Sequence, residues 1–207
     1  MKKWALGCGG LALVGILLVG VVFIGGCGSY NRLVSLQQST ESSWAQVQNV
    51  YQRRMDLIPN LVKTVEGAAN FERSTLTEVV QARASATQVK IDPANVTPEQ
   101  MAEFEKTQAH LSSALSRLLV TVERYPELKA NANFRDLQAQ LEGTENRITV
   151  ERQKFNDTAR QYNTAIRQFP GSIVAGFGHF TPKPYFQATP GSETPPQVQF
   201  NFGKTNK

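Results

Sequence analysis

The chain has 207 residues, with 22 lysines and arginines, 17 aspartates and glutamates, and a formal net charge of +5. Lys2 and Lys3 supply two of these charges, so the body from Gly28 onward, with 20 basic and 17 acidic residues, carries only +3 and no basic run. This pattern excludes nucleic-acid partners, which usually require a clustered cationic face. The only two cysteines, Cys8 and Cys27, precede the body, which therefore has neither a disulfide framework nor a cysteine-based metal site.

The first expected element is a membrane span. No charged residue lies between Trp4 and Arg32, and the apolar run ends near Ile24. A helix over this run reaches roughly 32 Å, enough to cross a bilayer core. We therefore predict a single transmembrane helix at about residues 4–26. The two lysines before it place the N-terminus in the cytoplasm and the body in the periplasmic or extracellular space.

Two other interpretations of this segment stay open. A cleaved signal peptide normally has a shorter apolar region, of about 7–15 residues. The sequence Ile24-Gly25-Gly26-Cys27 is similar to a bacterial lipobox, in which the chain is cut before a lipid-modified cysteine. The retained span is our main prediction, and a lipoprotein anchored at Cys27 is the alternative.

Helices are expected from the end of the span to Phe169. In the last of them an apolar or aromatic residue recurs every seven positions, which predicts a long helix with coiled-coil-like packing. Asn133 is the expected cap at its start. The recurring residues are Phe134, Leu141, Ile148, Phe155, Tyr162 and Phe169.

The helix before it has clear boundary signals. Thr97 suits the N-cap, Pro98 the first helical position, and Gln100 the partner position of a capping box. Tyr125 precedes a proline and marks the end. The apolar stripe runs in steps of three and four, with Gln108 as its only polar member. The stripe is Met101, Phe104, Gln108, Leu111, Leu115, Leu118, Val122 and Tyr125.

The region between residues 29 and 88 allows two interpretations. Either the chain turns near Asp56, with Pro59 in the first turn of a new helix, or one very long helix is kinked at Pro59. We expect the turn, because helices of roughly 26, 32, 25 and 36 residues form an up-and-down antiparallel four-helix bundle. Arg53 and Arg54 would then end the first helix, and Asp56 would cap the second. Residues 89–97 are expected to form a loop.

The C-terminal part is expected to be irregular. Beyond Phe169 we predict an extended segment that packs back on the bundle through its aromatic residues, Phe177, Phe180, Tyr185 and Phe186. The rest is rich in small and polar residues and is expected to be flexible. The predicted organisation is thus an anchor at 1–28, an all-α bundle with an aromatic extension at 29–187, and a flexible tail at 188–207.

No pattern in the sequence indicates catalysis. The only histidines are His110 and His179, and neither lies in a metal-binding or nucleophile-activating pattern. The carboxylate pair Glu103 and Glu105 is expected on a solvated helix face. We therefore predict no catalytic, cofactor or metal site and no enzymatic activity.

Two groups of polar residues are candidates for an interaction or a structural role. One surrounds the expected first turn, and the other lies where the seam of the final helix becomes polar around Glu145 and Arg152. A buried polar layer there would cost stability but would fix the register of the helices. The candidate residues are Arg53, Arg54, Asp56, Asn60, Glu145, Asn146, Arg147 and Arg152.

Several strings in the chain resemble the LemA family of bacterial membrane proteins. They keep the family's order and spacing from about Tyr30 to Phe186, with a mild departure in Gly67–Glu72. The resemblance implies an N-terminal membrane segment and a helical bundle outside the cytoplasm, and it supplies no reaction or cofactor. The strings are YNRLVSLQQ from Tyr30, RRMDLIPNLVKTVEGAANFE from Arg53, RLLVTVERYPELKANANF from Arg117, LQAQLEGTENRI from Leu137, and FNDTARQYNTAIRQFP ending at Pro170.

The expected function is that of a non-enzymatic scaffold or adaptor in the cytoplasmic membrane, whose bundle binds another envelope protein. The alternative is a ligand-binding or enzymatic bundle that uses the polar seam around Glu145 and Arg152. A concave pocket lined by those two side chains would favour the alternative. Self-association into a homo-oligomer is a third hypothesis.

Overall fold

The computed structural model describes the backbone of residues 2–68 and 71–187, and the side chains of residues 25–68 and 71–187. Within these residues the chain is all-α, as predicted, and contains no strand. The helices are α1 (Lys2–Glu66), α2 (Arg73–Gln88), α3 (Pro98–Val122), α4 (Pro126–Ala130), α5 (Ala132–Arg167) and α6 (Gly171–Gly178).

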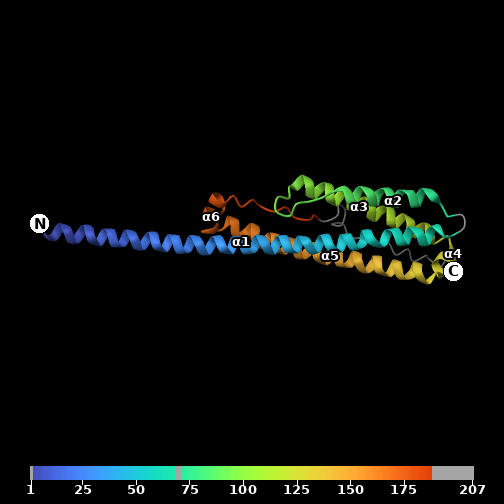
Figure 1. Ribbon diagram of the computed structural model, residues 1–207, viewed down its shortest axis with the longest axis horizontal. Helices are drawn as coiled ribbons and strands as arrows, with labels where there is room; N and C mark the ends of the chain where they lie inside the picture. Colours follow the sequence, from blue (N-terminus) through green and yellow to red (C-terminus); the bar gives the residue numbers. More distant parts are fainter. Residues whose placement is uncertain (1, 69–70, 188–207) are drawn as a thin grey trace, which may run out of the picture.

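The longest helices, α1 and α5, form an antiparallel pair that runs along the whole body (Figure 1). As the numbering rises along α1, the partners on α5 fall: Leu33 clusters with Ile166, Trp44 with Phe155, and Leu61 with Leu141. The α2–α3 hairpin packs beside the half of this pair that is farther from the N-terminus. The body is therefore a long helix pair with a shorter hairpin docked on it.

The predicted turn near Asp56 is wrong, because α1 continues through Arg53–Asn60 with Pro59 inside it. A proline has no N–H to donate to the carbonyl four residues earlier. That carbonyl belongs to Met55, and it accepts a hydrogen bond of 2.9 Å from Nε of Arg83 on α2. The neighbouring helix thus satisfies the group that Pro59 leaves without its usual partner, and the helix is not broken.

The first inter-helix turn lies eleven residues after Asp56, at Gly67, in the segment where the sequence departs from the family pattern. The N–H of Ala68 closes this turn on the carbonyl of Val65 at 3.0 Å. The later turn shortens the second helix to 16 residues and lengthens the first. The part of the chain that the structure describes therefore does not contain the four helices of similar length that the sequence predicted.

Helix α3 begins as predicted. The side chain of Thr97 accepts from the N–H of Gln100 at 3.2 Å, and the Gln100 side chain accepts from the N–H of Thr97 at 3.1 Å. Its apolar stripe is buried from Met101 to Val122, with Gln108 included. The loop predicted at residues 89–97 also forms, between Gln88 and Pro98.

Helix α5 buries its heptad residues from Phe134 to Tyr162, which confirms the predicted seam. The last member, Phe169, is 81% exposed because the helix ends at Arg167, before the stripe reaches it. The cap is Asn131 and not Asn133, since the Asn131 side chain accepts from the N–H of Phe134 at 3.3 Å.

The segment after α5 is partly helical, which corrects the extended chain predicted from Phe169 onward. Residues Gly171–Gly178 form α6, whose Ala175 is buried in a cluster with Leu33 and Tyr162. This tertiary packing outweighs the low helix propensity of the glycines. His179, with a φ of 56°, ends the helix in the left-handed region.

Beyond α6 the chain is extended, as predicted, and two asparagines of α5 hold it. The Asn163 amide bonds both backbone groups of Lys183 at 2.8 Å, and the Asn156 amide bonds both backbone groups of Phe186 at 2.8 and 3.0 Å. Seven helical residues span about 10.5 Å and three extended residues about 10 Å, so both pairs fit at once. The predicted flexible tail, residues 188–207, lies outside the described residues.

Replacing Asn163 by alanine is expected to lower the free energy of unfolding by about 1–3 kcal/mol, because both backbone groups of buried Lys183 lose their partner. Hydrogen exchange of the Lys183 amide should accelerate. The control is Asn146→Ala, at an exposed position of the same helix. Equal exchange of the Lys183 amide in both variants would contradict this account of the extended segment.

Among the residues whose side chains the structure describes, 25–68 and 71–187, no helix is long and apolar enough to cross a membrane. The span predicted at about residues 4–26 lies almost wholly outside them.

Candidate functional site

A polar cavity of about 480 Å³ lies beside the middle of α1, between α3, α5 and the extended C-terminal segment. It is lined by Tyr51, Arg54, Ala102, Glu105, Lys106, Gln108, Ala109, Ser112, Glu145, Arg152 and Gln187. We call this the central cavity. Two of its lining residues are Glu145 and Arg152, so the concave pocket that would favour the alternative function is present.

Arg54 is the most buried charged residue of the cavity wall, with only 2% of its surface exposed. Its Nη1 donates to Glu145 Oε2 at 2.8 Å and to Ser112 Oγ at 3.0 Å, and its Nη2 donates to the side-chain oxygen of Gln108. The guanidinium also lies 5.3 Å from the centre of the Tyr51 ring. Arg54 therefore joins α1, α3 and α5 at one point.

The partners of Arg54 differ in burial. Gln108 is buried, whereas the side chain of Glu145 is 54% exposed, so water screens part of the ion pair. The Nε atom of Arg54 is buried and has no hydrogen-bond partner among the described residues. A buried guanidinium with four of its five N–H groups in or near hydrogen bonds is typical of a structural junction between helices.

A second group forms the other wall of the central cavity. Arg152 Nη2 donates to Glu105 Oε1 at 2.6 Å and to the carbonyl of Gln187 at 2.9 Å. The N–H of Gln187 donates to the same Glu105 oxygen at 3.1 Å. The Arg152 guanidinium stacks over Phe186, 4.6 Å from the ring centre. This group therefore fastens the end of the extended segment to α3 and α5.

Burial shifts the acidity of two groups in the cavity. Desolvation raises the pKa of Glu105, partly offset by the positive charge of Arg152 and by the N–H of Gln187. Desolvation also raises the pKa of the Tyr51 phenol, against the opposing effect of the two arginines. Neither shift needs a substrate to explain it, since both follow from packing.

Replacing Arg152 by alanine is expected to raise the pKa of Glu105 further, because the nearest favourable charge is removed while the burial stays. The raised folded-state pKa means that this carboxyl contributes most to stability at low pH, and that its contribution is lost as the pH rises through that pKa. Carbon-13 NMR of the Glu105 carboxyl measures the shift. An unchanged or lowered pKa would contradict the ion pair.

The structure separates the predicted polar residues into two sets. Arg54, Glu145 and Arg152 line the central cavity, and the first two are in contact. The other predicted residues lie on exposed faces of α1 and α5 and do not line it. They are Arg53, Asp56, Asn60, Asn146 and Arg147. Asp56 accepts from Gln52 one turn earlier at 2.7 Å and caps no helix.

Glu105 was predicted to lie on a solvated helix face, and no role was predicted for Gln108. Both residues line the central cavity. A signal for Gln108 was present, since it is the only polar member of the α3 stripe. Arg54 has the same signature in α1, where the buried positions step by three and four. They are Trp44, Val47, Tyr51, Arg54, Ile58, Leu61 and Val65. The polar members of the two stripes bond each other.

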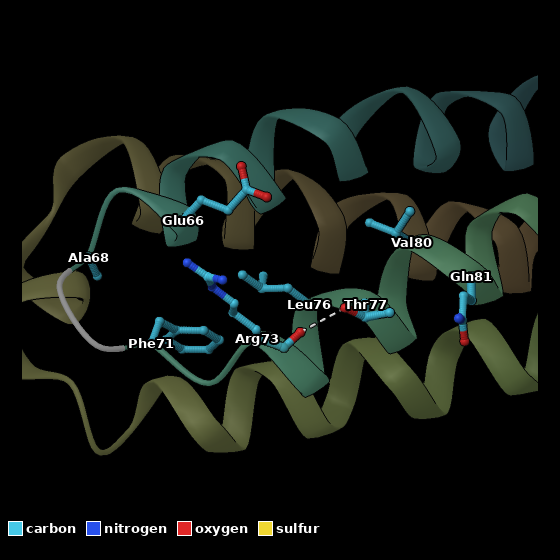
Figure 2. A pocket seen from close by; sticks show the side chains of 8 residues that line it. All are labelled: Glu66, Ala68, Phe71, Arg73, Leu76, Thr77, Val80 and Gln81. Carbon is cyan, nitrogen blue, oxygen red and sulfur yellow. Dashed lines mark hydrogen bonds between the residues drawn. The ribbon is translucent and has the colours of Figure 1, made fainter.

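A second cavity, of about 730 Å³, lies at the end of the body farthest from the N-terminus, where α1 passes to α2. Figure 2 shows Phe71 and Leu76 on its apolar side and Arg73 between them and Glu66. The hydroxyl of Thr77 donates to the carbonyl of Arg73 at 3.0 Å. We call this the distal cavity. Its charged groups are exposed, so it offers a surface for contact more than a site for chemistry.

Neither cavity holds the donors of a metal site. Within residues 25–68 and 71–187, no group of three or more histidine, cysteine, aspartate or glutamate side chains could hold a metal ion. The charged groups of the central cavity are arranged as ion pairs that join helices.

Comparison with known proteins decides the family. The model of the LemA family matches residues 43–200, which is more than half of the chain and includes both cavities. The chain belongs to the LemA family. The resemblance seen in the sequence motifs is thereby confirmed.

Relatives of this LemA protein include magnetosome proteins. The chain is 26% identical over 183 residues to Magnetosome protein MamQ 2 of Paramagnetospirillum magneticum, covering 80% of this chain and 67% of that protein. It is also 26% identical over 189 residues to Magnetosome protein MamQ of Magnetospirillum gryphiswaldense, covering 82% and 70%. Protein LemA of Metamycoplasma hominis is 23% identical over 160 residues, covering 77% and 69%.

Proposed function

We propose that this LemA protein is a single-pass, non-enzymatic protein of the cytoplasmic membrane, and that its body is a scaffold or adaptor for another envelope protein outside the cytoplasm. The observation that carries the proposal is the continuity of α1, which runs from Lys2 to Glu66 without a break. The apolar run of the sequence and the core-forming stripe of the body therefore share one helix.

A shared helix suits a scaffold because it allows no hinge between anchor and body. From Gly25 to Glu66 the helix covers about 63 Å, so the distal cavity would stand at a fixed height above the membrane. An adaptor that positions a partner at a set distance needs this stiffness. The ion pairs inside the body also stiffen it, because they hold its helices in register.

The relatives are compatible with this proposal. Three of those that match the chain are named as magnetosome proteins and another only as LemA, so the family is present in bacteria of different kinds. A common scaffold that serves different partners would account for relatives with different names. The role in assembling proteins at a membrane is proposed for this chain alone, since the names of its relatives state no such role.

The topology is tested by proteolysis. Protease added to cells with a permeable outer wall should digest the body from Ser29 onward and leave a small N-terminal fragment. A cytoplasmic protein in the same cells is the control and should stay intact. Protection of the body equal to that of the control would contradict the proposed orientation.

The lipoprotein alternative is tested by mass. Cys27 is exposed and lies within α1. A retained span predicts that the membrane-extracted chain has its full 22.9 kDa. A chain that begins at Cys27 with added lipid would replace the span by a lipid anchor, and Cys27→Ser would then release or mislocalise the protein.

The distal cavity is the proposed contact surface for the partner. It lies farthest from the predicted anchor, and of its apolar lining Val80 is half exposed while Phe71 and Leu76 are buried. A photo-crosslinking residue at Val80 should give one adduct of discrete mass in intact cells. The matched control is Val150, equally exposed but on α5. No adduct at Val80, or the same adducts at both positions, would contradict this placement.

The second candidate function, a ligand-binding bundle, is favoured by the central cavity itself. Its arginines are already paired with glutamates and backbone groups, so a ligand would have to displace those contacts. A small carboxylate could do so by replacing Glu145 or Glu105. This alternative predicts that succinate or citrate raises the melting temperature saturably, and that Arg152→Ala abolishes the rise. The scaffold proposal predicts no rise.

A further inference from the structure

The short helix α6 carries large apolar side chains that point away from the body. Phe177 is 85% exposed and Ile173 is 54% exposed, and their spacing of four residues places them on one face of the helix. Phe169, just before α6, is also exposed. Exposed apolar residues that gather in this way usually mark a surface that contacts something apolar. We call these three residues the α6 patch.

The α6 patch lies beside the part of α1 that directly follows the apolar run. Helix α6 packs on α1 and α5, and the ring of Tyr30 contacts that of Phe180 with centres 5.6 Å apart. A shallow apolar hollow of about 470 Å³ between the two helices is lined by Tyr30 and Cys27 on α1 and by Val174 and Phe177 on α6. Tyr30 is six residues, or about 9 Å of helix, beyond the last residue of the apolar run, Ile24.

Exposed arginines lie close to the patch. No aspartate or glutamate occurs in residues 25–40 or 158–179, whereas Glu41 and Asp157 come directly next to these ranges and Asp157 pairs with Arg160 at 3.0 Å. Arg32 and Arg167 are exposed there, and no ion pair to either is present among the described residues. The opposite end carries charges of both signs, and there Glu72 pairs with Arg124 and Glu123 with Lys129. The end near the apolar run therefore combines exposed apolar side chains with two exposed arginines that are in no ion pair among the described residues.

We propose that α6 is an interfacial helix that lies on the outer surface of the bilayer, with the α6 patch in the boundary between headgroups and acyl chains. Arg32 and Arg167 face the phosphates of anionic lipids. An apolar face with flanking cations is the pattern of helices that lie in the membrane interface. The inference rests on the proposed membrane anchor, because that anchor brings α6 to the surface.

The bilayer is the occupant that the position of the patch favours. A second protein docked at the α6 patch would have to share the few ångströms between α6 and the end of the apolar run with lipid headgroups. The membrane span and α6 would together orient the body, since α6 would fix the rotation of the body about α1. A scaffold held by a single helix could otherwise turn freely about the membrane normal.

The test measures depth with spin labels in the full chain. In a Cys8→Ser, Cys27→Ser background, single cysteines at Ile173 and at Phe177 carry the label. The chain is placed in bilayer discs of equal parts phosphatidylcholine and phosphatidylglycerol. Relaxation by oxygen, which enriches in the bilayer, is compared with relaxation by a water-soluble nickel complex. We expect both labels to favour oxygen, and to do so less in discs of phosphatidylcholine alone.

Two further labels make the outcome decisive. A label at the exposed Val120 of α3, at the far end of the body, should favour the nickel complex. A label at Leu17, in the apolar run, reports on the anchor itself. Nickel accessibility at Phe177 equal to that at Val120, with Leu17 in the bilayer, would overturn the interfacial helix and leave the anchor standing. Nickel accessibility at Leu17 would overturn both.

Discussion

Replacing Phe155 by alanine is expected to lower the free energy of unfolding of the body by about 3–5 kcal/mol, through lost burial and the cavity left behind. Phe155 is buried at the centre of an aromatic cluster. Its ring centre lies 5.3 Å from that of Trp44 and 5.5 Å from that of Phe186. One side chain therefore joins α1, α5 and the extended C-terminal segment.

Denaturant unfolding of the isolated body, residues 29–187, measures this effect. A domain of this kind has only about 5–15 kcal/mol of stability in total, so the loss should be plain. The control is Gln153→Ala, two residues away on the exposed face of the same helix. Equal losses in the two variants would show that α5 packs through a different face.

Replacing Arg54 by alanine is expected to lower the free energy of unfolding by about 1–3 kcal/mol for each buried polar partner left without a donor, which is a different reason from that of Phe155. The substitution leaves the buried side chain of Gln108 and the hydroxyl of Ser112 without the donor that joins them to α1. It also leaves a void beside Tyr51. The exposed partner Glu145 can turn to water, so most of the cost should come from the buried partners.

Arg53 provides the matched control for Arg54. It is the same residue type one position earlier, but it is exposed on the outer face of α1. Arg53→Ala should change stability by less than about 0.5 kcal/mol. Equal effects of the two substitutions would contradict the role of Arg54 as the junction of α1, α3 and α5. A loss of partner binding without loss of stability would favour a docking role.

The sequence predicted the elements whose signals are local. Thr97 and Gln100 each accept a hydrogen bond from the other's backbone N–H, and Pro98 at the first helical position has no N–H to satisfy, so the start of α3 was predicted to the residue. The heptad of α5 is a repeated signal over many turns, and its burial follows from period alone. Both predictions needed no knowledge of another part of the chain.

The length of α1 could not be predicted from local signals. Pro59 normally ends or kinks a helix, because it leaves a carbonyl without a donor. Here the donor is Arg83, on a helix whose position depends on the turn at Gly67. The buried positions of α1 keep their steps of three and four from Tyr51 past Pro59 to Leu61, which favours a continuous helix over the predicted turn. An apolar stripe that keeps its phase across a proline predicts helix continuity better than the expected helix lengths of a bundle do.

The central cavity was predictable only in part. Glu145 and Arg152 stood out because they interrupt the seam of α5, and both line the cavity. Glu105 and Gln187 could not be found in this way, since they meet Arg152 only when the extended segment folds back on α5. That contact depends on Asn156 and Asn163, which bond the extended segment. In the sequence they cannot be told apart from other polar residues of the helix.

The continuity of α1 is tested most directly by a distance between two spin labels in the full chain, held in bilayer discs. One label replaces Leu17 in the apolar run and the other replaces the exposed Arg53 in the body. A single helix over these 36 residues predicts a narrow distribution centred near about 54 Å. A broad distribution, or one centred more than about 10 Å shorter, would show a hinge between anchor and body and would contradict the rigid scaffold proposed here.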